Sequence, residues 1–234
     1  MKRLAPLVVC AAALAFAPAA PARIVELGTT ATPAKSRCPE NPCEVVGRVS
    51  GYQGRSDAVR NPFQVPSNGR IVAFTITLAK LEQNQMNYFT NLYGGTPAAR
   101  LTILRRGKRR KSRLDHRVMA QSRLYRLHRY FGSAPTFALS EPLRVRPGEI
   151  VALTVPTWAP AFARDLSKSN WWRSSRRKGD CDNVTQRGAQ QMLGNVGRYG
   201  CTYHTARLLY SATYVPDPEP TDAPQQPQPR PRRR

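Results

Sequence analysis

Residues 137–153 carry the clearest structural pattern in the chain: Phe137-Ala-Leu-Ser-Glu-Pro-Leu-Arg-Val-Arg-Pro-Gly-Glu-Ile-Val-Ala-Leu153. Apolar residues alternate with polar ones on both sides of Glu141-Pro142 and Pro147-Gly148, and a period of two is typical of a half-buried β-strand. Proline and glycine favour turns at these two places. The run therefore predicts short strands separated by turns.

The same pattern continues in both directions from this run. Further strands are predicted at residues 45–49, 72–78, 100–104, 117–121, 123–127 and 208–214. Residues 82–93 break the β pattern, because Met86, Phe89 and Tyr93 fall at helical spacing, and a short surface helix is expected there. Short strands with glycine and proline turns at intervals of about 8–12 residues are typical of an all-β sandwich or barrel.

Two of these segments resemble the late strands of jelly-roll sandwich modules. They are residues 137–153 and the closing run Leu208-Leu-Tyr-Ser-Ala-Thr-Tyr214. The resemblance is architectural and includes no diagnostic motif. It implies a jelly-roll-like antiparallel β-sandwich with at most one or two short helices. Many such modules bind carbohydrate in secreted enzymes, so by fold analogy alone the resemblance also implies a carbohydrate-binding module.

Residues 1–22 have the features of a secretory signal peptide. Lys2 and Arg3 precede an apolar run over residues 4–17, and Ala20-Pro-Ala22 supplies small residues at the expected cleavage site. The apolar run is shorter than the roughly 20 residues that a membrane-spanning helix needs. We therefore expect an exported protein, extracellular or associated with the cell envelope, without a transmembrane segment.

Composition divides the rest of the chain into three parts. Residues 23–42 mix threonine, alanine, proline and charge without periodicity, which predicts an N-terminal linker. Residues 43–215 are expected to form the β-sandwich domain, and within it residues 159–201 predict a long, irregular loop held by a disulfide. Residues 216–234 are rich in proline, glutamine and arginine, which predicts a disordered tail.

Four cysteines follow the signal peptide: Cys38, Cys43, Cys181 and Cys201. An even number of cysteines in an exported chain indicates disulfides, with three pairings possible. Short loops close most easily, which favours Cys38 with Cys43 and Cys181 with Cys201. A zinc site is the alternative, but no CxxC pair is present.

The net charge of +23 predicts polyanionic partners. Outside a cell these are cell-wall polymers, acidic polysaccharides, phospholipid headgroups and stray nucleic acid. Export disfavours nucleic acid, so anionic glycans or wall polymers are the expected class.

Seven of the nine residues from 105 to 113 are cations: Arg105, Arg106, Lys108, Arg109, Arg110, Lys111 and Arg113. The cluster follows a predicted strand and contains Gly107, so we expect it in a hairpin loop. Blocks of like charge bind phosphates or sulfates by releasing counterions. The alternative is a solvated loop that only keeps the protein soluble. A second cluster comprises Arg173, Arg176, Arg177 and Lys178.

Trp171 and Trp172, with Tyr199 and Tyr203 nearby in sequence, predict an aromatic platform for sugar rings or bases. Neighbouring residues of a strand point to opposite faces, so at most one tryptophan would face a ligand. The alternative is that these rings pack in the core.

Motifs for catalysis are scarce. The three histidines, His116, His128 and His204, form no HExxH pattern, and the chain has no GxSxG elbow or P-loop. Glu141 and Glu149 stand at predicted turns, where solvated charges are ordinary. No catalytic residue is therefore assigned.

A bound cofactor is not expected either, although Asp180-Cys-Asp-Asn183 offers oxygen ligands of a kind that calcium prefers. It lacks the remaining spacing of an EF-hand loop, so a structural calcium is an alternative only.

These observations lead to one hypothesis and two alternatives. The first is a secreted, non-enzymatic binding module for anionic glycans or cell-envelope polymers, with the basic loop for attraction and the aromatic residues for selectivity. The second is a structural envelope-associated protein held by charge, with no specific ligand. The third is a secreted hydrolase of wall polysaccharide.

Overall fold

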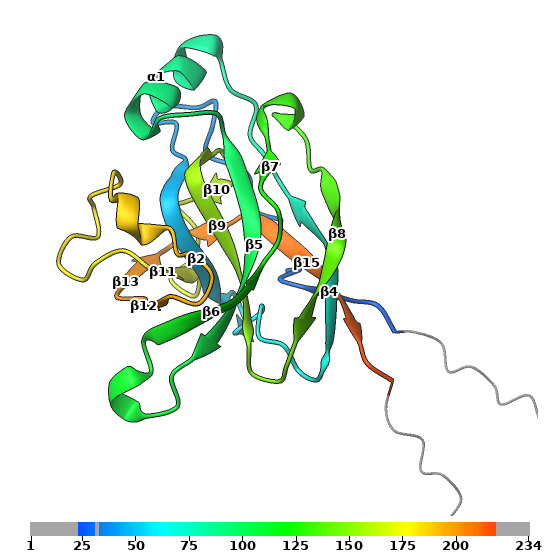
Figure 1. Ribbon diagram of the computed structural model, residues 1–234. Coiled ribbons are helices and arrows are strands. Elements are labelled where there is room, and N and C mark those ends of the chain that lie inside the picture. The colour runs from blue at the N-terminus through cyan, green and yellow to red at the C-terminus, as the bar shows by residue number, and fades with distance from the viewer. Residues whose placement is uncertain (1–22, 31–32, 219–234) are drawn as a thin grey trace, which may run out of the picture.

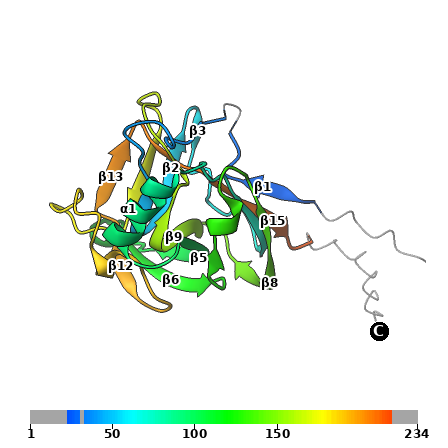
Figure 2. The ribbon, with the colours of Figure 1, turned by 90° about the horizontal axis from the view of Figure 1, so that it is seen from above.

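Two antiparallel β-sheets pack against each other in the computed structural model, which describes residues 23–30 and 33–218 (Figure 1). The predicted signal peptide, residues 1–22, and residues 219–234 of the predicted tail lie outside the described residues. Seen from above, the small sheet with β1, β8 and β15 lies to one side, and the large sheet with β5, β6 and β9 lies to the other (Figure 2). The prediction of an all-β sandwich is confirmed.

The small sheet has the strand order β1-β15-β4-β8. Its strands are β1 (Val25–Leu27), β4 (Gly69–Ile76), β8 (Thr136–Val145) and β15 (Tyr210–Pro216). The predicted turn at Glu141-Pro142 lies inside β8, where the pairing with β4 shifts register. Between the pairs Ile71 with Leu143 and Ala73 with Ala138, β8 has three more residues than β4, and this irregularity accommodates the proline outside the ladder without ending the strand.

The large sheet has the order β12-β6-β5-β9-β2-β11-β13. Its main strands are β2 (Val46–Ser56), β5 (Ala98–Arg106), β6 (Asp115–Gln121), β9 (Ile150–Ala159), β11 (Trp171–Ser174), β12 (Val196–Arg198) and β13 (Cys201–His204). Shorter strands are β3 (Val59–Arg60), which pairs with β2, and β7 (Tyr125–Arg126), which pairs with β5. β10 (Phe162–Ala163) and β14 (Arg207–Leu208) form a separate pair.

The helix predicted at residues 82–93 is present as α1 (Gln83–Tyr93). Glu82 and Gln85 form a capping box at its start, which satisfies backbone N–H groups that the first turn leaves free. Its buried face packs on β9, with the rings of Phe89 and Trp158 5.6 Å apart. Three short 3₁₀ turns complete the described structure: η1 (Arg110–Ser112), η2 (His128–Tyr130) and η3 (Arg187–Ala189).

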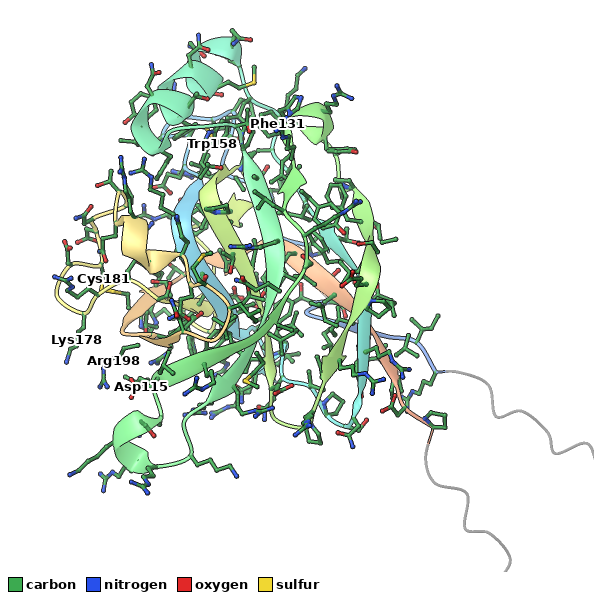
Figure 3. All side chains as sticks on the ribbon, viewed as in Figure 1. Asp115, Phe131, Trp158, Lys178, Cys181 and Arg198 are labelled. Atoms are coloured by element: carbon green, nitrogen blue, oxygen red, sulfur yellow. A yellow bond between two sulfur atoms is a disulfide. The ribbon has the colours of Figure 1, made fainter. Side chains whose placement is uncertain are left out.

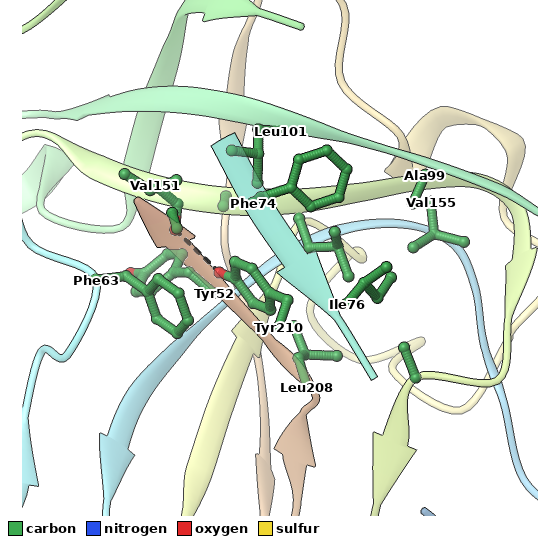
Figure 4. Packing of buried hydrophobic residues seen from close by; sticks show 14 of the residues in the cluster. Tyr52, Phe63, Phe74, Ile76, Ala99, Leu101, Val151, Val155, Leu208 and Tyr210 are labelled. Carbon is green, nitrogen blue, oxygen red and sulfur yellow. Dashed lines mark hydrogen bonds between the residues drawn. The ribbon is translucent and has the colours of Figure 1, made fainter. Parts of the chain in front are cut away.

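The main core lies between the two sheets (Figure 4). Phe63 stacks on Tyr210 of the small sheet at 4.1 Å between ring centroids. The Tyr210 hydroxyl donates a hydrogen bond of 2.9 Å to the carbonyl oxygen of Val151 in the large sheet. Burying a phenol is unfavourable unless its O–H is bonded, so this contact satisfies the hydroxyl and also joins the sheets.

The prediction of a linker over residues 23–42 is wrong for part of that segment. Val25–Leu27 pairs with β15 as β1, and Leu27 is buried in the core. Farther along, Cys38 is bonded to Cys43. The edge of β15 offers free backbone groups, and a strand can pair there without a strong apolar pattern of its own.

Residues 159–201 also differ from the expected irregular loop. They contain β10, β11, η3 and β12, and β11 is sandwiched in the large sheet between β2 and β13. The strand predicted at residues 123–127 is reduced to the two residues of β7. Pairing with distant strands determined all of these elements, and local periodicity does not report such pairing.

The disulfide prediction is confirmed: Cys38 pairs with Cys43, and Cys181 pairs with Cys201.

Candidate functional site

The basic cluster at residues 105–113 comprises the last two residues of β5 and most of its hairpin connection to β6, as predicted, and projects from the end of the large sheet (Figure 1). Two of its cations have partners: Arg105 pairs with Glu149, and Arg106 Nε donates to the carbonyl oxygen of Arg113 at 2.8 Å. The other five side chains are exposed and form no ion pair within the described structure. They are Lys108, Arg109, Arg110, Lys111 and Arg113. We call residues 105–113 the basic hairpin.

Glu149 anchors the base of the basic hairpin. The expectation of a solvated carboxylate at a turn is wrong here, because Glu149 is only 4% exposed. Its Oε1 accepts bonds of 3.0 and 2.7 Å from Arg105 Nε and Nη2, and its Oε2 accepts the Arg146 backbone N–H at 2.9 Å. A buried carboxylate needs such partners, so the packing of the hairpin base requires Arg105.

Where β6 leaves the hairpin, Asp115 pairs with Arg198 of β12 at 3.2 Å (Figure 3). β12 pairs antiparallel with β6, so the C-terminal end of β12 lies beside the hairpin, and the Tyr199 backbone N–H donates to the carbonyl oxygen of Leu114 at 2.8 Å.

The second basic cluster is divided between structural and exposed residues. Arg176 is buried, and its guanidinium donates to the carbonyl oxygens of Gly47 at 3.0 Å and Cys181 at 3.3 Å. Arg173 is half-buried, with its guanidinium 5.6 Å from the Trp171 ring centroid. Only Arg177 and Lys178 are exposed to solvent.

The four predicted aromatic residues do not form one platform. Trp172 is buried and stacks on Tyr203 across β11 and β13, with 4.4 Å between centroids. Trp171 is half-buried and lies over Gly54. Tyr199 is fully buried beside Tyr52 and His116, and burial raises the pKa of its hydroxyl well above the usual value.

Trp172 and Tyr203 instead form one wall of a cleft of about 580 Å³ near α1. Tyr88 and Phe89 of α1 also line this aromatic cleft, together with the ion pair between Glu44 and Arg164. Three buried polar atoms of its lining have no hydrogen-bond partner within the described structure: Glu44 Oε2, Trp172 Nε1 and Arg176 Nε.

A second cleft of about 650 Å³ adjoins β12, and most of the residues that line it are polar or charged. Its cations are Arg177, Arg187 and Arg198, and Asp180 is its one carboxylate among the described residues. Its amide side chains are Gln186, Gln190, Gln191 and Asn195. The Oε1 atoms of Gln190 and Gln191 are buried without a partner in the described part of the chain. Guanidinium groups suit carboxylates and sulfates, and amides suit hydroxyls, so this polar cleft has the chemistry for an acidic sugar.

Sequence reasoning did not identify the polar cleft. Its signal is the density of amides and arginines between residues 186 and 198. That signal does not indicate a cleft in the sequence alone. The cleft exists because β12 pairs with β6, and its lining also includes Ser175 and Arg177.

The residues considered for catalysis lie in different environments. His116 is buried, whereas His128 and His204 are exposed. Glu141 is exposed on β8. Within the described residues, no group of three or more histidine, cysteine or carboxylate side chains could hold a metal ion. In the proposed calcium segment, Asn183 Oδ1 instead accepts the Thr185 hydroxyl at 2.8 Å.

Comparison with protein-family models, curated proteins and solved structures gave no match. Among residues 23–30 and 33–218, no helix combines the length and apolar character that crossing a membrane requires.

Proposed function

We propose that this protein is a secreted, non-enzymatic binding module for anionic glycans or cell-envelope polymers. The observation that carries the proposal is the basic hairpin, where five exposed cations have no carboxylate partner in the described structure. Repulsion within such a cluster destabilises the folded chain, and a bound polyanion removes it. The hairpin projects into solvent, where a polymer can reach it (Figure 1).

The polar cleft supports a selective component of binding. Attraction by the hairpin depends on charge and discriminates little between polyanions. In the cleft, Arg177, Arg187 and Arg198 would bind the acidic group of one sugar, while the orphaned amide oxygens of Gln190 and Gln191 would accept its hydroxyls. Discrimination between sugars follows because buried amides left unpaired by the wrong ligand are unfavourable.

The binding experiment compares the mature full-length protein on neutral glycans, acidic glycans and wall polymer at about 0.15 M and about 1 M NaCl, a range that largely screens exposed charges. One variant replaces five hairpin cations by glutamine: Lys108, Arg109, Arg110, Lys111 and Arg113. Its control removes the same charge from exposed cations elsewhere: Arg60, Lys80, Arg126, Arg129 and Lys168. We expect the hairpin variant to lose at least about tenfold in affinity at low salt, and the control to lose much less. Equal losses in both variants would show that only net charge matters and would contradict the role of the hairpin.

A second pair of variants tests selectivity. Arg177→Gln with Arg187→Gln should abolish discrimination among acidic glycans, whereas Arg126→Gln with Arg129→Gln should preserve it. If the wild type binds every polyanion alike and releases all of them at high salt, the protein is a structural envelope component held by charge. That result would overturn selective recognition.

Export is tested separately. Cleavage after Ala22 gives a mature chain that begins at Arg23, so mass spectrometry of the exported protein should find that N-terminus. Recovery of the intact chain only inside the cell would contradict this part of the proposal.

A further inference from the structure

The turn between η3 and β12 exposes an unusual group of apolar side chains. Of the eight large apolar side chains exposed in the described part of the chain, three fall within five residues: Met192 at 55%, Leu193 at 63% and Val196 at 55%. Single exposed apolar residues are ordinary on a protein surface, but a contiguous group marks an interaction site. We call Met192, Leu193 and Val196 the apolar turn.

The apolar turn is held in one conformation. The Asn195 backbone N–H donates to the Met192 carbonyl at 3.1 Å, and Gly194 takes the positive φ of +81° that this turn requires. Two backbone hydrogen bonds attach the turn to β6 of the large sheet. The Gly194 N–H donates to the Val118 carbonyl at 3.0 Å, and the Val118 N–H donates to the Asn195 carbonyl at 2.9 Å. The side chains of Met192 and Leu193 are therefore presented to solvent by a rigid support, which lowers the entropy lost on binding.

Cations border this apolar group directly. Arg117 Nη1 donates to the carbonyl oxygen of Gly194 at 2.9 Å, and Arg100 Nη2 lies 3.8 Å from Met192 Sδ. Neither arginine forms an ion pair within the described structure. The basic hairpin joins β6 at Asp115, two residues before Arg117 on the same strand.

We propose that the apolar turn docks on an anionic phospholipid membrane. Met192 and Leu193 would enter the boundary between headgroups and acyl chains, while Arg100 and Arg117 bind lipid phosphates beside them. Interfacial binding strengthens with buried apolar area and with attraction to anionic lipid, and this surface provides both. A glycan in water gives the exposed Met192 and Leu193 no apolar partner, so the membrane suits this surface better. The inference does not depend on glycan binding.

The test measures partition of the full-length protein onto vesicles of phosphatidylcholine, with and without phosphatidylglycerol. Met192→Ser with Leu193→Ser removes the most exposed side chain of the turn, Leu193, and its neighbour Met192. The matched control, Val59→Ser with Leu124→Ser, removes apolar side chains of 47% and 48% exposure that lie elsewhere. We expect the first pair to reduce partition onto anionic vesicles by at least about tenfold, and the control to change it by less than about twofold. Both double variants should bind glycans as the wild type does, which separates this outcome from any failure of the proposed function.

A tryptophan placed in the turn gives an independent readout that does not rely on a destabilising substitution. Fluorescence of Leu193→Trp should shift to the blue and be quenched by brominated lipid, whereas Leu124→Trp should not respond. Equal partition of the two double variants would overturn the proposal. So would a tryptophan at position 193 that stays in water on bound vesicles, since binding would then come from surface charge alone.

Discussion

His116 is a buried histidine surrounded by cationic neighbours. Its Nδ1 lies 2.9 Å from the carbonyl oxygen of Leu114, and a carbonyl can only accept, so Nδ1 carries the proton. Nε2 therefore accepts the hydrogen bond from the Tyr52 hydroxyl, at 3.2 Å. Desolvation is the main cause that lowers the pKa of His116 from 6.5 to about 4; the Leu114 bond opposes this, and Arg106 and Arg173 add to it.

This lowered pKa predicts how stability depends on pH. Between about pH 6.5 and pH 4 the unfolded chain binds a proton at His116 that the folded chain excludes. Neutral His116 should thus stabilise the fold in full above pH 6.5. The free energy of unfolding should fall by up to about 3 kcal/mol as the pH drops to 4. Urea denaturation at several pH values measures the slope.

The control for this prediction compares two histidine variants. His116→Gln should flatten the slope, whatever stability it costs at neutral pH, whereas His204→Gln, at an exposed position, should leave it unchanged. Identical slopes in the two variants would show that His116 is not the titrating group.

At the scale of elements, β2 is the strand that accommodates the aromatic rings around it. Three of its glycines, Gly47, Gly51 and Gly54, lie directly under the rings of Tyr93, Trp172 and Trp171. A Cβ added to Gly51 would lie 2.7 Å from the Trp172 ring, closer than packed atoms approach. Glycine inside a strand marks such a close approach, so the glycines permit the stacking of Trp172 on Tyr203.

Replacing one glycine tests this role. Gly51→Ala should displace Trp172, reduce stability by about 1–3 kcal/mol and weaken the near-ultraviolet circular dichroism of the stacked rings. Gly188→Ala is the matched control, because nothing lies within 4 Å of the added Cβ. An unchanged aromatic signal in Gly51→Ala would mean that the strand can move away from the ring at little cost.

At the scale of the whole molecule, the two disulfides close loops of different length. Cys38 and Cys43 are 5 residues apart, and Cys181 and Cys201 are 20 apart, spanning the segment that forms the polar cleft. In the chain-entropy model the longer loop stabilises by about 3 kcal/mol and the shorter by about 2 kcal/mol.

We predict which disulfide contributes more to stability. Replacing Cys181 and Cys201 by serine should lower the free energy of unfolding more than replacing Cys38 and Cys43, as measured by urea denaturation. It should also weaken binding of acidic glycans, since the cleft segment then loses its covalent link to β13. The reverse order of stability would show that native packing around Cys38 and Cys43, rather than loop length, dominates.

Much of the architecture could be predicted because its signals are local. Alternation along β4 and β15 reports which face of a strand is apolar, and the cation run at the end of β5 indicates a solvated hairpin. The spacing of the cysteines similarly favoured the pairing that the structure has. By contrast, β1 and β11 depend on the edges of β15 and β2, which lie far away in sequence.

The sequence by itself determined the all-β class, the single helix of the described structure and the exposed basic hairpin, because periodicity and turn residues act between near neighbours. It favoured the disulfide pairing without deciding it. Only the tertiary structure decided the surroundings of individual side chains. It buried Glu149 against Arg105, separated Tyr199 from Trp172 and Tyr203, and assembled both clefts and the apolar turn. Burial and orphaned polar atoms depend on which distant strands become neighbours, and that follows from packing the whole chain around one core.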